Sequence, residues 1–156
     1  MKPKGYALSQ IVLHWLIVAM LIVSYLSSEA MHIRPGESPT AGTGVHVWFG
    51  IAILVLMLGR LGLRLTLGAP EPPEGGPSWA AKLAGITHWA LYAMLVALPV
   101  LGAMAWFGGI HVAGDIHSLL FNVAFAVVGL HVLAALYHQF VLKDGLLDRM
   151  RRPARG

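Results

Sequence analysis

The chain has 156 residues, 57% of them hydrophobic and 12% charged, so a soluble fold could not bury its apolar surface and the surrounding solvent must be lipid. The net charge is +4, and gathering of the basic residues on one side of the membrane explains this excess without a nucleic-acid partner. The absence of cysteine excludes disulfides, iron–sulfur clusters and covalent cofactor attachment through C-x-x-C-H.

Four apolar runs are each near or above the roughly 20 residues that cross about 30 Å of hydrocarbon. They cover residues 7–27, 44–64, 80–104 and 115–142. Because the interior of a bilayer offers the backbone no hydrogen-bond partners, such runs fold as helices. The sequence therefore predicts an all-α fold, an integral membrane four-helix bundle of up-down-up-down topology, formed by a single domain over residues 1–156.

The first run has a second interpretation. Lys2 and Lys4 precede it and small residues follow it, which is also the pattern of a secretory signal peptide. The run is long for a signal peptide and contains His14 and Trp15, and its removal would leave an odd number of spans. We therefore interpret it as a retained membrane helix.

The connections between the spans are short. Residues 28–43 form the first external loop, and residues 106–114 form a brief second one. Between them, the linker 69–77 (A-P-E-P-P-E-G-G-P) cannot be helical throughout. Functional side chains are therefore expected in the core of the bundle, on facing helices.

The basic residues predict the orientation. Ten of the eleven Lys and Arg residues lie on one side of the membrane, and only Arg34 lies on the other. By the positive-inside rule, both termini and the linker between the second and third spans are cytoplasmic. The ten residues are Lys2, Lys4, Arg60, Arg64, Lys82, Lys143, Arg149, Arg151, Arg152 and Arg155.

Histidines inside the spans are the strongest functional signal. Ionisable residues are costly within a membrane, so each is a functional candidate, although a single one could merely hydrogen-bond between helices. Two of them, His117 and His131, project from nearly the same helix face about 21 Å apart along the axis. That separation is too large for one metal ion and suits two sites, one near each side of the bilayer. The five candidates are His14, His46, His88, His117 and His131.

Depth within the spans pairs the outer histidines and leaves the inner ones open. His46 begins the second span and His117 begins the fourth, so both lie in the external half of the membrane, where they can pair. His14, His88 and His131 all lie a few ångströms on the cytoplasmic side of their span midpoints. Three candidates for two ligand positions leave the inner pair unresolved.

Haem iron suits these residues better than zinc does. Zinc takes four tetrahedral ligands, usually including thiolates or carboxylates, whereas haem already supplies four nitrogens and needs two axial histidines and an apolar slot. Gly50, Gly85 and Gly129 are candidates for accommodating a porphyrin, or simply for close helix packing. Arg60 and Arg64 could pair with haem propionates or with anionic lipid. An iron with both axial positions filled favours electron transfer over oxygen chemistry.

Five segments that cover nearly the whole chain carry a family resemblance. They are S-Q-I-V-L-H-W-L with His14, G-V-H-V-W-F-G-I-A-I-L-V-L-M-L-G-R-L-G-L-R with His46, H-W-A-L-Y-A-M-L-V-A-L-P-V-L-G with His88, D-I-H-S-L-L with His117, and G-L-H-V-L-A-A-L-Y-H with His131 and His138. In combination they resemble the bacterial cytochrome b561 family, which is related to the cytochrome b subunits of nickel hydrogenases.

The resemblance implies two non-covalent b-type haems. Their ligands would be His46 with His117 on the external side and His14 with His131 on the internal side. His88 would then be free to hydrogen-bond a haem propionate or to line a quinone pocket, or it would make only a structural hydrogen bond.

The resemblance further implies a multi-pass protein of the bacterial inner membrane that oxidises superoxide and reduces ubiquinone. His138 would be an interfacial histidine. The connection 106–114 is shorter than in some relatives, which puts a donor site built from this loop in doubt.

Three functions are therefore compared. The leading one is a membrane di-haem cytochrome b that transfers electrons between a periplasmic-side donor, with superoxide as a candidate, and the quinone pool. The external charges leave no net positive face, so they do not favour electrostatic steering of superoxide. The second is a cytochrome b anchor subunit that carries electrons for a partner dehydrogenase or hydrogenase. The third, a histidine-based proton or metal transporter, is disfavoured because no Asp or Glu lies mid-span.

Overall fold

The computed structural model describes residues 5–32, 38–71 and 77–153, and within these ranges no strand occurs. The long helices are α1 (Leu8–Leu26), α2 (Ala41–Leu67), α3 (Ser78–Gly108) and α4 (His111–Tyr137). The chain beyond α4 continues as a single π-helical turn, η2 (His138–Leu142). Two short 3₁₀ turns, η1 (Ser28–Met31) and η3 (Leu147–Met150), follow α1 and η2.

All four helices are long and apolar enough to cross a membrane. Large apolar side chains that would be buried in a soluble protein are exposed on them, for example Leu119 and Leu130, which are 67% and 66% exposed. This pattern is expected where lipid is the solvent. The predicted all-α four-helix membrane bundle is confirmed. Arg34 lies outside the described residues, as do Lys2, Lys4 and Arg155.

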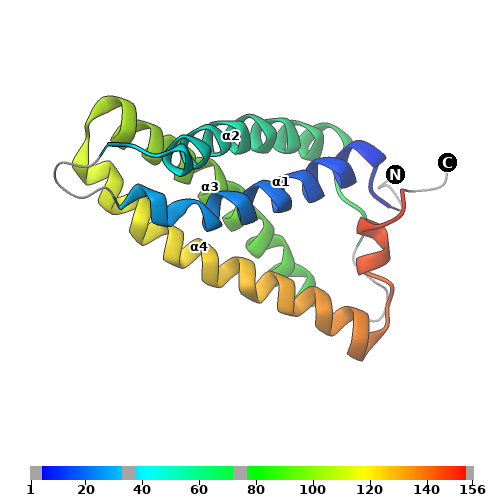
Figure 1. Ribbon diagram of the computed structural model, residues 1–156. Coiled ribbons are helices and arrows are strands. Elements are labelled where there is room, and N and C mark those ends of the chain that lie inside the picture. The colour runs from blue at the N-terminus through cyan, green and yellow to red at the C-terminus, as the bar shows by residue number, and fades with distance from the viewer. Residues whose placement is uncertain (1–4, 33–37, 72–76, 154–156) are drawn as a thin grey trace.

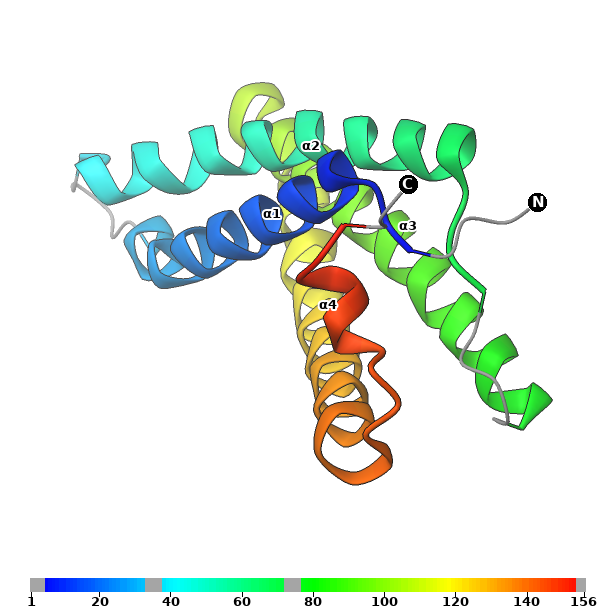
Figure 2. The same ribbon diagram turned by 90° about the vertical axis from the view of Figure 1, so that its right-hand side faces the viewer.

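The helices alternate in direction along the bundle (Figure 1). The end of α1, the start of α2 and the turn from α3 to α4 lie at one end, which we call the outer end. The start of α1, the end of α2, the start of α3 and η3 lie at the opposite, inner end. Seen from that end, α4 diverges from α1 and α2 toward its own C-terminus (Figure 2).

The turn between α3 and α4 is shorter than the sequence predicted. Residues 106–108 still belong to α3 and His111 already begins α4, so only Gly109 and Ile110 connect the helices. Gly109 has a φ of 65°, and its N–H bonds to the carbonyl of Ala105, while the N–H of Ile110 bonds to that of Met104. This left-handed glycine closes the helix end and reverses the chain. His111, expected in a loop, is therefore the first helical residue of α4.

A small apolar core lies in the middle of the bundle, and every helix contributes to it. Because few polar atoms occur at this level, dispersion and shape determine the packing rather than hydrogen bonds. We call these residues the apolar layer: Ile17, Ile53, Met57, Leu95, Leu98 and Ala124.

A buried glutamine ties α1 to α2 at the inner end. Gln10 is 5% exposed and donates from Nε2 to the carbonyls of Gly68 at 3.0 Å and Leu63 at 3.4 Å, while its Oε1 accepts from the N–H of Ala7 at 3.1 Å. In return, Arg60 donates to the backbone carbonyl of Gln10 at 2.6 Å. The start of α1 is thus fixed against the last turns of α2.

Candidate functional site

The structure brings His46 of α2 and His117 of α4 together at the outer end. Their ring centres are 6.3 Å apart and their planes are inclined at 75°. Metal–imidazole bonds of about 2 Å, with each ring centre about 1 Å behind its ligating nitrogen, place the ring centres of two trans ligands about 6 Å apart. The two side chains therefore stand at the spacing of a pair of axial ligands.

Both outer histidines are also held by backbone carbonyls. His46 Nδ1 lies 2.9 Å from the carbonyl oxygen of Ser24, and His117 Nδ1 lies 2.8 Å from that of Leu98. A carbonyl can only accept, so Nδ1 is the donor in each imidazole, and the lone pair of the neutral ring is then on Nε2. Metal-ligating histidines are held in the same way. Sequence reasoning did not identify these carbonyls, because backbone acceptors leave no trace in residue type.

The inner end holds three histidines in a different arrangement. The rings of His88 and His131 are 5.3 Å apart at an angle of 72°, whereas the ring of His14 contacts Trp15 at 5.2 Å. The contact between His88 and His131 is closer than the spacing at the outer pair, so it is an edge-to-face ring contact rather than the spacing of axial ligands. The depths predicted from the sequence did not decide which two of the three inner histidines pair. In the structure, the ring of His88 contacts that of His131.

On α4, the helix that carries both an outer and an inner histidine, the apolar layer lies between the two. On α4 the separation is regular, since Ala124 lies seven residues after His117 and seven before His131. Seven residues are nearly two turns, so all three side chains share one face. Ala124 is only 3% exposed, which places this face toward the other helices.

The donor set fits haem rather than a tetrahedral metal ion. Across the described ranges, no group of three or more His, Cys, Asp or Glu side chains is arranged to hold a metal. A structural zinc site would need four such ligands, whereas haem requires only two from the protein. The pair His46 and His117 meets that smaller requirement.

The three glycines singled out from the sequence do not mark close helix contacts. A Cβ added at Gly50, Gly85 or Gly129 would meet no heavy atom within 4 Å. Gly102, which sequence reasoning did not identify, does mark one, because a Cβ there would lie 3.2 Å from the ring of His117. A glycine in the interior of a helix lowers the stability of that helix, so the presence of Gly102 was the sequence feature that could have indicated this contact.

The polar candidates at the inner end have partners of their own. Arg60 donates to the carbonyl of Gln10, so at least part of its guanidinium is already engaged. At the end of α4, His138 Nδ1 lies 2.5 Å from Asp144, whose other carboxylate oxygen accepts from the N–H of Leu146. Burial alone would raise the pKa of the Asp144 carboxyl, but these hydrogen bonds outweigh it and lower the pKa below its ordinary value.

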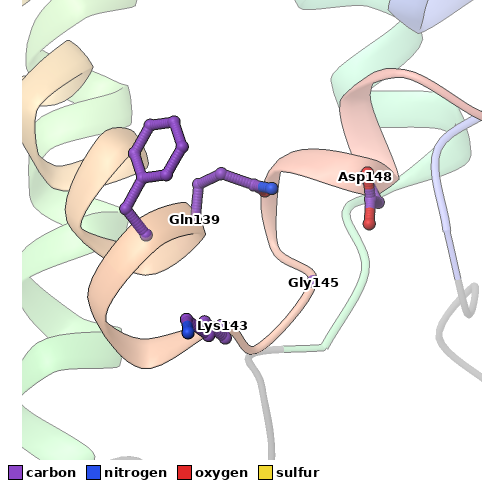
Figure 3. Close-up of a pocket in the computed structure, with 5 residues that line it drawn as sticks. Gln139, Lys143, Gly145 and Asp148 are labelled. Atoms are coloured by element: carbon purple, nitrogen blue, oxygen red, sulfur yellow. The ribbon is translucent and has the colours of Figure 1, made fainter.

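A pocket of about 330 Å³ opens beside this turn (Figure 3). It is lined by Gln139, Phe140, Lys143, Gly145 and Asp148. Gln139 reaches from the end of the helix toward the returning loop that carries Gly145 and Asp148. None of the five intramembrane histidines lines it, so it is separate from both histidine groups.

Comparison with known proteins agrees with this arrangement. A profile of the family described as prokaryotic cytochrome b561 matches residues 5–153. The chain is 41% identical to cytochrome b562 of Cereibacter sphaeroides, covering 97% of this chain and 98% of the relative. It is 33% identical to the probable superoxide oxidase CybB of Yersinia pestis, over 98% and 99% of the two chains. It is 29% identical to cytochrome b561 homolog 1 of Escherichia coli, over 93% and 96%.

The match covers nearly the whole chain and includes every histidine discussed above. Four apolar helices, intramembrane histidines and full-length relatives named as cytochromes all agree. The chain therefore belongs to the prokaryotic cytochrome b561 family, and it is a multi-pass, haem-binding cytochrome b of the bacterial inner membrane that carries electrons.

Proposed function

We propose that this cytochrome holds two b haems, stacked across the membrane, and transfers electrons between a periplasmic-side donor and the quinone pool. The observation that carries the proposal is the outer pair, His46 and His117. Their ring centres are 6.3 Å apart, and each ring is hydrogen-bonded through Nδ1 to a backbone carbonyl. The inner pair is His14 with His131, as the family resemblance implies. The haems supply reversible one-electron chemistry.

The protein contributes the orientation of the outer imidazoles and the hydrogen bonds that hold them. Carbonyls of α1 and α3 hold the two outer imidazoles through Nδ1, so Nε2 is the nitrogen that each ring can offer to iron. With two histidines per iron, no coordination position remains for oxygen or substrate. This supports electron transfer to molecules that approach the edge of the site rather than chemistry at the metal.

His88 has a supporting role in this proposal. Its ring contact with His131 places it beside an inner ligand, where it can donate to a haem propionate or to a quinone oxygen. Arg60 and Arg64 occupy the same inner half of α2 and supply positive charge for the propionates. The basic residues of this half also support a cytoplasmic inner end under the positive-inside rule.

Superoxide is the donor that one relative's name suggests. The described external residues do not add attraction for an anion, since His32 lies 3.8 Å from the carboxylate of Glu29 and both are largely exposed. A docked protein donor is the alternative, in which the chain serves as an anchor subunit. Haem reduction by enzymatically generated superoxide, with a quinone as acceptor, distinguishes these two, because an anchor subunit would be reduced only in the presence of its partner.

Haem stoichiometry tests the ligands directly. The purified protein should contain two b haems per chain, and His46→Ala and His117→Ala should each leave one. His111→Ala, at an exposed position on the same helix as His117, is the matched control and should retain both. A colourless preparation would overturn the cytochrome proposal in favour of a transporter. If His88→Ala loses a haem while His14→Ala does not, the inner ligand pair is His88 with His131.

A further inference from the structure

The two outer histidines obtain their carbonyl acceptors in different ways. Ser24 lies in the last turn of α1, where helical carbonyls have no partner within the helix and are open to side chains. Leu98 lies ten residues before the end of α3, where each carbonyl ordinarily accepts from the N–H four residues on and is covered by that turn. His117 therefore needs a special opening to reach the Leu98 carbonyl.

Gly102 provides that opening. It is the residue four positions after Leu98, and a Cβ there would lie 3.2 Å from both Cε1 and Nδ1 of His117. Such a distance is shorter than ordinary van der Waals contact, so the ring would have to shift by a few tenths of an ångström. Among the described glycines between positions 42 and 145, Gly102 alone brings an added Cβ against a histidine ring.

We propose that Gly102 is a positioning residue, which admits the His117 ring to the Leu98 carbonyl and so holds the ring by a hydrogen bond from Nδ1. The inference rests on the proposed role of His117 as an axial ligand. It adds a residue on α3, a helix that contributes no outer ligand, to the support of the outer haem.

The effect of a substitution follows from these contacts. Alanine has a higher helix propensity than glycine, so Gly102→Ala would stabilise α3 considered alone. Any loss at the outer site must therefore come from displacement of the ring. Loss of a partner beside a metal ligand typically weakens metal binding about 10- to 100-fold. Without its carbonyl partner the imidazole is also a weaker electron donor, so the midpoint potential of the outer haem should rise.

The test compares three variants of the holoprotein. Haem transfer to apomyoglobin measures the retention of each haem, and a redox titration followed by low-spin ferric EPR measures the outer potential and ligand field. Gly102→Ala should lose the outer haem about 10- to 100-fold faster, with a raised outer potential and an unchanged inner haem. Gly59→Ala, at an exposed helical glycine whose added Cβ meets no atom within 4 Å, should behave as the unmodified protein.

His117→Ala distinguishes the ligand role of His117 from the positioning role of Gly102. If that variant keeps both haems, the proposed ligand pair is wrong and the role of Gly102 falls with it. If His117→Ala loses the outer haem but Gly102→Ala retains it with the same potential and EPR signal, the positioning role alone is wrong. Equal weakening of both haems in Gly102→Ala would assign the glycine to general helix packing and would also overturn the inference.

Discussion

Gln10 offers a test that connects the packing of α1 with the inner histidines. Replacement by alanine would remove its two donated hydrogen bonds to α2 and the bond that it accepts from Ala7. Inter-helical hydrogen bonds in membranes are worth about 0.6 to 2 kcal/mol each. Two of the three are well formed, at 3.0 and 3.1 Å, and the third is long, at 3.4 Å. We therefore expect a loss of about 2 kcal/mol in the free energy of unfolding.

The consequence should extend to haem binding, because Gln10 and His14 lie four residues apart on one face of α1. Unfolding in a titration of mixed micelles with SDS measures stability, and haem transfer measures the inner site. Thr66→Ala is the matched control, since its hydroxyl bonds within its own helix at an exposed position. If Gln10→Ala unfolds within about 0.5 kcal/mol of the unmodified protein, the bond between α1 and α2 does not stabilise the bundle as argued.

Three further perturbations test other parts of the structure. Met57→Ala, in the apolar layer and at a residue only 3% exposed, should cost about 2 to 5 kcal/mol in SDS unfolding, and a cost under about 1 kcal/mol would mean that the layer is loosely packed. Gly109→Ala should cost about 1 to 2 kcal/mol, because its φ of 65° is unfavourable for any side chain, and an unchanged stability would contradict the assigned turn. Asp144 stabilises the turn after α4 at neutral pH, since its folded pKa lies below its ordinary value of 3.8; this contribution should disappear as the pH falls from about that value through the folded pKa. Asp144→Asn should lack this part of the acid dependence, measured as unfolding against pH, and an identical acid profile in both proteins would refute the contribution.

Hydropathy was sufficient to predict the four helices, because lipid leaves the backbone of a long apolar run no alternative to the helix. Positions near the start of the second and fourth spans predicted that His46 and His117 can pair, and the structure brings their rings together. The inner histidines show where this reasoning stops. His14, His88 and His131 share a depth, and the choice between them depends on how each helix is rotated and inclined, which the sequence does not encode locally.

The supporting contacts were harder to foresee for a different reason. Ser24 and Leu98 act through their carbonyls, which every residue possesses, and Gly102 acts by lacking a side chain. Such contributions can be recognised only when the side chain that packs against them from the neighbouring helix is known. The turn at Gly109 was misjudged in length because helix ends depend on local hydrogen bonds that apolar patterning does not resolve.

The apolar layer has a consequence for the energy supply of a cell. Electrons can cross a few ångströms of hydrocarbon by tunnelling, whereas protons need a continuous chain of hydrogen-bonding groups. The side chains of Ile17, Ile53, Met57, Leu95, Leu98 and Ala124 contain no such group. Under the proposed function, electrons would pass between the two sides of the membrane, while protons would meet no hydrogen-bonding side chain in this layer.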